Sequence, residues 1–453
     1  MRVLVIGGGI GGLAAARELG QAGHEVLVLE GTDRVGGKVR LGSVAGITVD
    51  VGAEAMLNRR PEATGLARAV GLDLVHPATV ASRIWTRDAL RPLPRSVMGI
   101  PADLDQLAAT GVLDDAGMAR VRAEQVLPLE ARDVPVADFV GARLGHQVVD
   151  RIVEPMLGGV YAGHAAELSA RATIPQVLAL LEKSPSLLAA ASAVPAPSEV
   201  PVFAGLAGGI GQLPAAIVDA GGFTVRTDAM VRELRRTPSG FEAVVGPTTA
   251  AELITADQVV LAVPAPAASR LLSGVAPVAT LELAAIEYAS MAIVTLAFPA
   301  DELAGLEGSG FLVPPVDGRR VKAATFSSRK WGWVGEAGRS AGGLVVLRTS
   351  LGRHREEAAL QASDTELVQQ SLADLALATG LGTSVRPVDA HVQRWGGGLP
   401  QYAVGHLDRV ARIRQAVAQV PGLAVCGAAY DGIGIPAVIA SAHRAVADLG
   451  TSR

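Results

Sequence analysis

The sequence has one cysteine, Cys426, and only four lysines among its 453 residues. A single thiol excludes an internal disulfide framework and a metal cluster held by several cysteines, and it suits a reducing compartment. The net charge is −4, so the chain has no overall positive field that would attract nucleic acid. An anionic ligand must therefore be bound by local cations, which in this chain are mostly arginines.

Long apolar runs are missing as well. The longest uncharged apolar run, around YASMAIVTLAFPA at 288–300, is too short to span a bilayer. The apolar run after Arg2 is interrupted by glycines and followed at once by the strand-like EVLVLE, which is not typical of a secretory signal. We therefore expect a cytoplasmic protein, for which an exposed apolar patch would allow at most peripheral contact with the inner face of a membrane.

The sequence also shows no arrangement of residues typical of a metal site or of acid–base catalysis. The eight histidines are never paired at metal-ligand spacing, and neither a Ser-His-Asp order nor a pair of carboxylates stands out. We expect no metal site and no catalytic side chain, so a bound cofactor would have to supply the chemistry.

A nucleotide-binding pattern opens the chain. RVLVIGGGIGGLAAARELGQAGHEVLVLEG predicts a strand, a glycine turn, a helix and a second strand, with G-x-G-x-x-G spacing in the turn. Gly7 permits the tight turn, Gly9 lets a diphosphate approach the backbone, and Gly12 lets the helix pack on the strand. The helix N-terminus offers N–H groups to phosphates, and Glu30 would accept hydrogen bonds from a ribose. The residues expected at this dinucleotide site are Gly7, Gly8, Gly9, Ile10, Gly11, Gly12, Glu30 and Gly31.

A second motif, GTDRVGGKVRLGSV, follows immediately and contains Arg34, Gly37 and Lys38. It resembles the second fingerprint of the large family of FAD-binding amine and porphyrinogen oxidases, and pyridine-nucleotide dehydrogenases do not usually continue in this way. The glycine pair would bring further N–H groups to the diphosphate, and the lysine would offset its charge. FAD is therefore the expected cofactor.

The nucleotide domain is expected to be discontinuous. Strands that suit it return in GGFTVRTDAMVRELRRT and ADQVVLAVPAPAA, and again in LAVCGAAYDGIGIPAVIASAHRAVADL. The expected fold class is α/β, with a Rossmann-like FAD-binding domain of amine oxidase type built from 1–60, 203–270 and 385–453. Residues 61–202 are expected to form a mainly helical insertion facing the substrate or a membrane, in which SPSLLAAASAVPAPSEVP predicts a loop. Residues 271–384 are expected to form a mixed substrate-domain sheet.

Five further segments carry a more specific resemblance. They are EPMLGGVYAGHAAELSARATIPQ at 154–176, GAEAMLNRRPE at 52–62, FSSRKWGW at 326–333, RWGGGLPQYAVGH at 394–406 and DGIGIPAVI at 431–439. In this order, and across nearly the whole chain, they are similar to FAD-dependent porphyrinogen oxidases of heme synthesis. The similarity is greatest to the Gram-positive type, which oxidises coproporphyrinogen III to coproporphyrin III.

This resemblance implies removal of six electrons from the porphyrinogen, so one FAD would turn over three times. Each turnover would move a hydride to flavin N5, and molecular oxygen would then reoxidise the flavin and yield hydrogen peroxide. Growing conjugation of the product supplies driving force, so no strong general base is required. The implied partners are the porphyrinogen and oxygen, with transient contact to a downstream ferrochelatase.

The resemblance also implies cofactor contacts residue by residue. The backbone at Val231 would touch adenine, and Gly52 to Ala55 would run beside the isoalloxazine ring. Trp395 would flank the ring; the alternative is that its side chain only packs in the hydrophobic core. A closing helix is expected after the glycine turn of LAVCGAAYDGIGIPAVIASAHRAVADL, and its start would stabilise charge at N1 and O2 of reduced flavin. Beyond the first motif the implied positions are Arg34, Gly37, Lys38, Gly52, Ala53, Glu54, Ala55, Val231, Trp395, Ile433, Gly434 and Ile435.

The glycines of EPMLGGVYAG would let backbone approach a flat macrocycle, with Tyr161 and Met156 as apolar walls. Glu154 and Pro155 are expected to end the helix before them. The alternative is a glycine-mediated helix crossing without a ligand.

The propionates of such a substrate need cations. Arg60 and Arg59 are the first candidates, and Arg329, with Lys330 beside it, is the next. The alternative is that the arginine pair is a solvated face.

Three other functions stay open. A protoporphyrinogen IX oxidase would share the fold and chemistry, and no motif separates it cleanly. A flavin amine oxidase usually has an aromatic cage over the flavin, whereas aromatic residues are only 3 % of this chain. A GDP-dissociation-inhibitor-like protein would bind lipid without redox chemistry, but the GIGIP turn and the DRVGGK motif favour a filled flavin site.

Overall fold

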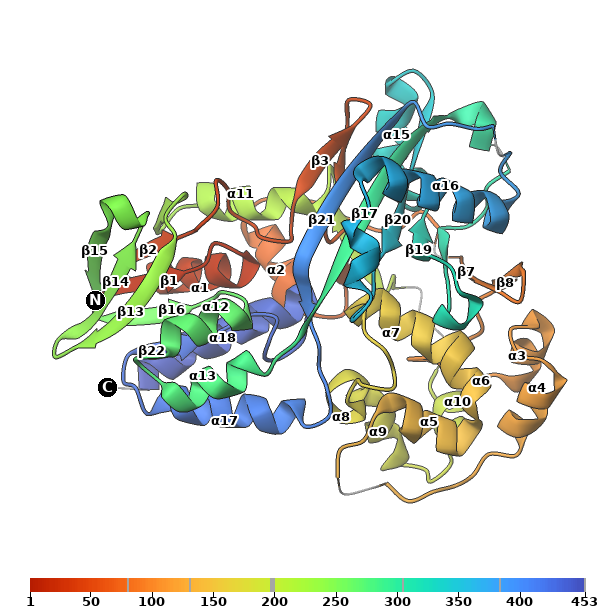
Figure 1. Ribbon diagram of the computed structural model, residues 1–453, viewed down its shortest axis with the longest axis horizontal. Coiled ribbons are helices and arrows are strands. Elements are labelled where there is room, and N and C mark those ends of the chain that lie inside the picture. The colour runs from red at the N-terminus through yellow and green to blue at the C-terminus, as the bar shows by residue number, and fades with distance from the viewer. Residues whose placement is uncertain (80, 130–131, 196–199, 304, 383, 452–453) are drawn as a thin grey trace.

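The computed structural model describes residues 1–79, 81–129, 132–195, 200–303, 305–382 and 384–451. Figure 1 shows three regions. A parallel sheet with its helices holds both termini, a large mixed sheet rises above it, and a cluster of helices lies below that sheet. The nucleotide pattern belongs to the first region.

The parallel sheet has the order β12-β2-β1-β16-β22. Residues along β1 alternate between two cores, because successive side chains of a strand point to opposite faces. Val3 and Val5 enter the core formed with the first and last helices, whereas Leu4 and Ile6 enter the opposite core. The strands are β1 (Arg2–Ile6), β2 (Glu25–Leu29), β12 (Thr224–Arg226), β16 (Gln258–Leu261) and β22 (Leu423–Val425). The predicted strands in all of these segments are confirmed.

Helices cover both faces of this sheet. One face carries α1 (Ile10–Gln21), α2 (Pro61–Ala69), α11 (Leu213–Asp219) and α18 (Ile435–Thr451). The other carries α12 (Ala265–Leu272), α13 (Pro277–Ala284) and α17 (His406–Ala418), with an antiparallel sheet of β13 (Val231–Thr237), β14 (Gly240–Val245) and β15 (Glu252–Ala256). The predicted closing helix is confirmed as α18.

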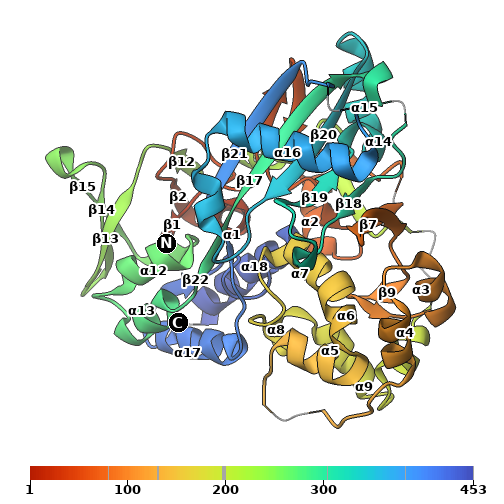
Figure 2. The same cartoon turned by 45° about the vertical axis from the view of Figure 1, so that its right-hand side comes forward.

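The large sheet has the order β21-β17-β20-β19-β18-β7-β8. Its strands are β7 (Ser82–Thr86), β8 (Ala89–Pro92), β17 (Tyr288–Pro299), β18 (Gly310–Leu312), β19 (Val321–Thr325), β20 (Leu344–Leu351) and β21 (Asp389–Pro400). Helix α16 (Asp364–Thr379) packs on one face, as Figure 2 shows, and on the other side lie β3 (Leu41–Val44), β4 (Ile47–Asp50), α14 (Ser327–Lys330) and α15 (Gly332–Ser340). The strands predicted in SMAIVTLAF, SGFLVPP and GGLVVLRTS are confirmed.

Three of these strands lie outside the segment expected to form the sheet. The β7–β8 hairpin comes from the insertion expected to be mainly helical, and its turn is made by Arg87 and Asp88, both at positive φ. β21 comes from a segment expected in the nucleotide domain. Its GGG run is not typical of a strand, but the residues on both sides of that run, 389–395 and 399–400, pair with β17, and this tertiary pairing outweighs local preference.

The helical region buries its own core under the large sheet. It contains α3 (Leu104–Thr110), α4 (Asp115–Arg122), α5 (Val136–Leu144), α6 (His146–Val148), α7 (Glu154–Tyr161), α8 (Ala170–Thr173), α9 (Pro175–Leu181) and α10 (Leu187–Ser192). Short strands join it to the rest: β5 (Met56–Leu57), β6 (Leu74–Val75), β9 (Ser96–Val97), β10 (Ile100–Pro101) and β11 (Phe203–Leu206).

Two expectations in this region were wrong. Glu154 and Pro155 do not end a helix, because a π-helical turn at Val149–Val153 leads without a break into α7. The wider turn shifts the backbone bonding just where proline offers no N–H. Part of the predicted loop SPSLLAAASAVPAPSEVP is helix α10, which Ser186 caps by accepting from the Ala189 N–H; residues 196–199 of that stretch lie outside the described part of the chain.

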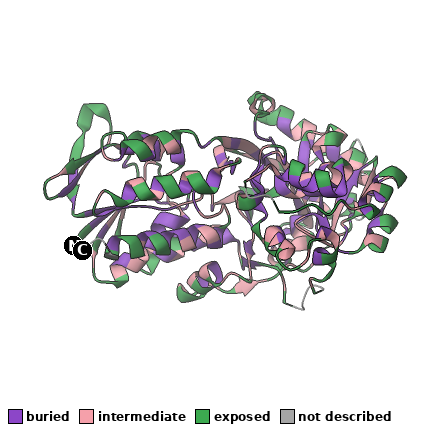
Figure 3. Ribbon diagram, turned by 90° about the horizontal axis from the view of Figure 1, so that it is seen from below, coloured by how far each residue is buried: buried purple, intermediate pink, exposed green. Residues whose placement is uncertain are grey.

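Burial follows this layering. Figure 3 shows buried strands between helices whose outer faces are exposed. Within the part of the chain that the structure describes, no helix is both long and apolar enough to cross a membrane.

Candidate functional site

The two glycine motifs lie against each other. The N–H of Gly36 donates to the carbonyl of Gly8 at 2.8 Å, and Gly9 and Gly36 form a parallel bridge. A Cβ added to Gly9, the N-cap of α1, would meet no atom within 4 Å. A Cβ on Gly12, in contrast, would lie 1.9 Å from the carbonyl oxygen of Gly7. Gly12 is thus required for packing, whereas Gly9 leaves an open surface at a helix N-terminus.

Glu30 follows β2 and organises the same turn. Its carboxylate accepts the N–H of Gly8 at 2.8 Å and the N–H of Thr32 at 2.9 Å. Its carbonyl accepts the Ala229 N–H at 2.8 Å, which places the start of β13, at Val231, beside the turn. Glu30, Gly31 and Val231 are therefore brought together, as an adenosine site requires.

Two cations of the second motif, Arg34 and Lys38, differ in their hydrogen-bond partners. Arg34 donates to the carbonyls of Val35 (3.1 Å) and Gly37 (2.9 Å), so it holds the glycine turn. Lys38 has no hydrogen-bond acceptor for its ammonium among the described residues, and burial lowers its pKa. An uncompensated cation beside two glycine turns is suited to an anion such as a diphosphate.

Glu54 forms a buried charge network. Its carboxylate lies 2.6 Å from Lys330 Nζ and 3.1 Å from Arg348 Nε, and Glu54 is only 9 % exposed. Burial alone would raise the pKa of this carboxyl, but the charges of Arg348 and Lys330 outweigh it and hold the pKa below its usual range. The site therefore keeps a fixed negative charge between two cations.

The same network fixes the 52–55 segment against the large sheet. Arg348 Nη1 donates to the carbonyl of Gly52 at 2.9 Å, and Trp395 Nε1 donates to that of Val51 at 3.1 Å. A Cβ on Gly52 would lie 2.0 Å from the carbonyl oxygen of Lys38. Gly52 to Ala55, Lys38 and Trp395 thus lie together, although they are up to 357 residues apart in a chain of 453.

The turn at 427–434, called the closing turn below, precedes α18. The helix begins at Ile435, so Ile433 and Gly434 lie just before it rather than within it. Ile433 packs against the core of the helical region. Gly11 faces α18, since its Cβ would lie 3.0 Å from the side chain of Val438. The closing turn therefore connects the glycine turn of α1 with the helical region.

The predicted substrate arginines surround one short sheet. Arg60 is paired with Glu62 at 2.6 Å, whereas Arg59 and Arg329 are exposed and have no side-chain partner among the described residues. β5, which ends two residues before Arg59, pairs with β11, and Lys330 Nζ lies 6.0 Å from the ring centre of Phe203 on β11. Cations thus gather around an exposed aromatic ring.

Helix α7 presents one of its glycines to the large sheet. A Cβ on Gly159 would lie 3.6 Å from the side chain of Leu312, and Val160 is 45 % exposed. Met156 is half-buried, and Ser96 Oγ lies 3.8 Å from its Sδ. Tyr161 is instead turned into the core, where burial raises its pKa to about 12.

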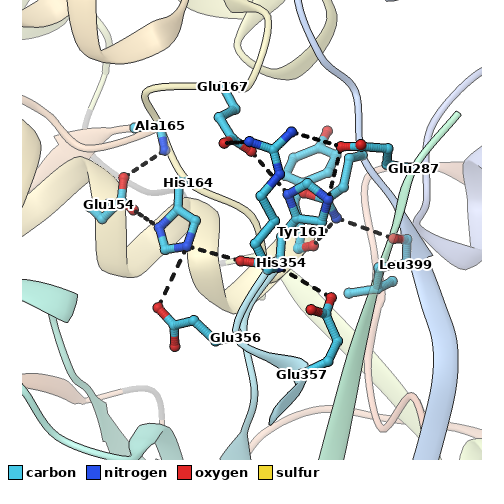
Figure 4. Close-up of polar contacts among 12 residues, drawn as sticks. Glu154, Tyr161, His164, Ala165, Glu167, Glu287, His354, Glu356, Glu357 and Leu399 are labelled. Atoms are coloured by element: carbon cyan, nitrogen blue, oxygen red, sulfur yellow. Dashed lines mark hydrogen bonds and ion pairs between the residues drawn. The ribbon is translucent and has the colours of Figure 1, made fainter. Parts of the chain in front are cut away.

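A cluster of ionic side chains connects the end of α7 to the large sheet through hydrogen bonds and ion pairs (Figure 4). We call it the polar junction; it consists of Glu154, His164, Glu167, Glu287, His354, Arg355 and Glu356. His164 Nδ1 lies 3.0 Å from Glu154 Oε1, and the N–H of His354 donates to the carbonyl of Ala162 at 2.7 Å. Ala162 has φ 49°, so the junction holds the chain in the left-handed bend that ends α7.

The hydrogen bond to Glu154 raises the pKa of His164 above its usual value. A raised pKa stabilises the fold below about pH 6.5, the usual histidine pKa, and this contribution disappears as the pH rises through the higher folded value. We therefore expect His164→Gln to lower the free energy of unfolding by about 1 to 2 kcal/mol at pH 6. The difference should nearly vanish at pH 9.

Urea unfolding at both pH values checks this expectation. His443→Gln is the matched control, because it removes a more exposed pair with Glu18 and should cost less than about 1 kcal/mol. An equal loss for His164→Gln at pH 6 and pH 9 would contradict the assigned charge state.

Sequence reasoning missed the polar junction and the roles of Lys330 and Arg348. His164 and His354 are 190 residues apart, and Lys330 is 276 residues from Glu54. Neither pair has a local signal, since contact depends on how β19 and β20 are placed in the sheet.

These elements define a dinucleotide-binding α/β protein whose site lies beneath a second, mixed sheet. The profile of the family described as "Flavin containing amine oxidoreductase" matches residues 10–450, so the chain belongs to that family. It is therefore an oxidoreductase, and its cofactor is FAD.

Full-length relatives are similar to the chain. "Coproporphyrinogen III oxidase" of Mycobacterium tuberculosis (strain ATCC 25618 / H37Rv) is 39% identical over 459 residues, covering 98% of this chain and 96% of the relative. The protein of the same name from Bacillus subtilis (strain 168) is 30% identical over 471 residues, covering 98% and 97%. Among solved structures, "Putative protoporphyrinogen oxidase from Exiguobacterium sp. 255-15" has a TM-score of 0.88 and 31% identity, covering 100% of this chain and 99% of its own.

The residues of this site fit FAD. Gly9 leaves an unfilled cradle at the N-terminus of α1, and Lys38 supplies a cation that has no acceptor within the described part of the chain. Glu30 ends the strand next to this cradle. This donor set is suited to an adenosine diphosphate, because backbone N–H groups and a cation meet the phosphates while a carboxylate meets the ribose.

Proposed function

We propose that the protein catalyses the FAD- and oxygen-dependent oxidation of coproporphyrinogen III to coproporphyrin III in heme biosynthesis. The observation that carries the proposal is the 39% identity, over 98% of the chain, to a relative named coproporphyrinogen III oxidase. The bound flavin supplies the redox chemistry by taking two electrons from the substrate per turnover and passing them to oxygen, so that three turnovers yield three hydrogen peroxide molecules.

The chain's own residues would bind and orient the two molecules. Residues of the two glycine motifs, with Lys38, would hold the diphosphate, and Glu30 and the backbone of Val231 would meet the adenosine. The 52–55 segment and Trp395 would lie beside the isoalloxazine ring. Support comes from the contacts that bring these residues together without filling the space at Gly9. Ile433, Gly434 and Ile435 would meet the far end of the ring through the N-terminus of α18.

The substrate slot would lie at the edge of the contact between α7 and β18. Exposed Gly159 lies close to Leu312, and on the same helix exposed Val160 follows it and Met156 lies one turn before it, so a flat macrocycle could approach backbone on one side. Tyr161 would support this wall from within the core rather than touch the ring.

Coproporphyrinogen carries four carboxylates, two more than protoporphyrinogen, and such groups require cations. Arg59 and Arg329 are exposed and have no side-chain partner among the described residues, and Arg60 follows Arg59 in the chain. We therefore expect Arg59→Gln to raise KM for coproporphyrinogen III roughly 5- to 20-fold, as loss of a charge-assisted hydrogen bond of about 1 to 2 kcal/mol implies.

The same change should affect KM for protoporphyrinogen IX less and leave kcat similar. Arg68→Gln is the matched control, because Arg68 is an exposed arginine in the last turn of α2. An unchanged KM for coproporphyrinogen III would remove Arg59 from the site, and an equal rise in KM for both substrates would assign it to a carboxylate that both carry.

Protoporphyrinogen IX oxidation is the second candidate. It is favoured by the 0.88 TM-score to the Exiguobacterium structure and by the exposed apolar Phe203 and Val160, which suit a less charged macrocycle. Anaerobic mixing with each porphyrinogen decides between them. Rapid bleaching of the flavin by coproporphyrinogen III, and slower bleaching by protoporphyrinogen IX, is the expected result; an oxidised flavin after mixing with coproporphyrinogen III would refute the substrate assignment.

The proposed setting is the cytoplasm, with peripheral contact at the inner membrane face and transient contact with a ferrochelatase that takes up the product. Cys426 is buried and unpaired, which is compatible with a reducing compartment.

A further inference from the structure

Tyr402 is a buried tyrosine, 2 % exposed, that reaches into the closing turn. Its hydroxyl donates to the carbonyl of Ala428 at 2.6 Å and accepts the N–H of Gly432 at 2.8 Å. One side chain thus bridges two backbone groups four residues apart. Burial raises the pKa of Tyr402 well above its usual value, so the hydroxyl keeps its proton and remains a donor.

The Tyr402 ring is held on both sides. It stacks on His406 with ring centres 3.9 Å apart and planes at 15°, and its centre lies 5.6 Å from that of Tyr161. The backbone carbonyl of Tyr402 accepts the N–H of Ser169 at 2.8 Å. The position of the hydroxyl is therefore fixed by α17 and by the helical region.

The closing turn needs such support because two of its glycines are conformationally free. Gly427 and Gly432 have φ of 132° and 130°, values that other residues rarely adopt. The Asp431 carboxylate pairs with Arg414 and Arg444, but these contacts hold a side chain rather than the backbone of the turn. The Tyr402 hydroxyl joins the backbone on both sides of Asp431.

Tyr430, within the same turn, offers a contrast. It is 1 % exposed, yet its hydroxyl has no hydrogen-bond partner among the described residues. Removing that hydroxyl breaks no bond to the turn. The two tyrosines are thus similar in burial and different in what their hydroxyls hold.

We propose that Tyr402 is a positioning residue whose hydroxyl sets the backbone of the closing turn, and with it the N-terminus of α18, for contact with the flavin. The inference rests on the proposed placement of FAD, in which Ile433, Gly434 and Ile435 meet the pyrimidine end of the ring. Tyr402 itself acts through the turn and does not touch the reacting atoms. Because its ring also contacts Tyr161, the same residue links the wall of the substrate slot to the flavin contact (Tyr161 appears in Figure 4).

The test compares Tyr402→Phe with Tyr430→Phe. Both remove one hydroxyl from a buried ring, and Tyr402→Phe keeps the stack on His406. The apoproteins are reconstituted with FAD, and the dissociation constant is measured by quenching of flavin fluorescence, together with the flavin midpoint potential and the melting temperature of each apoprotein.

Tyr402→Phe should raise the FAD dissociation constant about 10-fold and shift the midpoint potential, whereas Tyr430→Phe should change neither. A purely structural role would lower the melting temperature without moving the potential. Equal FAD dissociation constants and potentials for the two variants would overturn the proposal.

A measurement on the unmodified chain covers the case in which Tyr402→Phe does not fold. Amide hydrogen exchange of the apoprotein should show the Gly432 N–H protected at least 10-fold relative to an open turn. An unprotected amide would mean that the bridge does not exist. None of these readouts uses a porphyrinogen, so a wrong substrate assignment leaves them intact, and failure of the unmodified chain to bind FAD would count against the proposed function instead.

Discussion

Gly9→Ala will leave the apoprotein folded but weaken FAD binding roughly 10- to 100-fold, as expected for a steric cost of about 1 to 3 kcal/mol. The fold tolerates the change because Gly9 has φ −68° and the new Cβ meets no protein atom within 4 Å. Loss of the preferred N-cap glycine should cost only about 1 kcal/mol of stability. The methyl group would instead occupy the space proposed for the diphosphate.

Gly12→Ala is the matched comparison, three residues along the same turn. Its Cβ would lie 1.9 Å from the carbonyl oxygen of Gly7, a backbone atom that cannot move without displacing β1 from α1. We expect a loss of more than about 3 kcal/mol of stability even without cofactor. Flavin fluorescence titration and urea unfolding of both variants separate the two roles. If Gly9→Ala bound FAD as tightly as the unmodified chain, the diphosphate would have to lie elsewhere.

Glu54→Gln will destabilise the apoprotein by about 3 to 5 kcal/mol, because it leaves Lys330 and Arg348 as largely enclosed cations, 19 % and 15 % exposed, without their shared counter-charge. Glu62→Gln is the control, since its partner Arg60 is partly exposed and loss of that pair should cost less than about 1 kcal/mol. Adding Lys330→Gln to Glu54→Gln should recover part of the loss, because one of the two unpaired cations is then gone.

The pH dependence of Glu54→Gln has a definite sign. The folded pKa of Glu54 is lowered, so its contribution is fully present above the unfolded value near 4.3 and is lost as the pH falls through the folded value. Urea unfolding should therefore show the full difference at pH 7 and a smaller one below about pH 4. A difference that stays constant down to pH 3 would show that packing, rather than charge, explains the loss.

The parts of the fold predicted from sequence are those with short-range signals. β1, α1 and β2 were predictable because a strand pattern precedes Gly7, Gly9 and Gly12 and a helix and second strand pattern follow them, and α18 because a glycine turn precedes a helical pattern. The placement of the second glycine motif beside the first was implied by the family resemblance and is seen in the Gly9–Gly36 bridge.

The contacts that could not be predicted depend on how strands far apart in the sequence align in the sheet. Nothing near Glu54 indicates that Lys330 and Arg348 neutralise it, since these contacts require β20 to pair beside β19 in one particular alignment. The helix through Pro155 was missed because proline usually ends a helix, and only the π-helical turn before it removes the conflict. Tyr402 gave no signal because its partners, Ala428 and Gly432, are backbone groups.

The long ribbon of β17 and β21 has a mechanical consequence. The two strands pair from Tyr288 and Pro400 at the base to Ala297 and Asp389 near the tip, and the Tyr288 hydroxyl accepts the N–H of Ala265 in the nucleotide half. Each strand has 12 residues, so the ribbon is about 40 Å long. It extends as one stiff two-stranded element from the flavin half into the large sheet. Because this ribbon connects the two halves, any motion of one half relative to the other must bend it. The bend would occur at the bulge between Ala289 and Met291, beside Trp395, which faces the 52–55 segment.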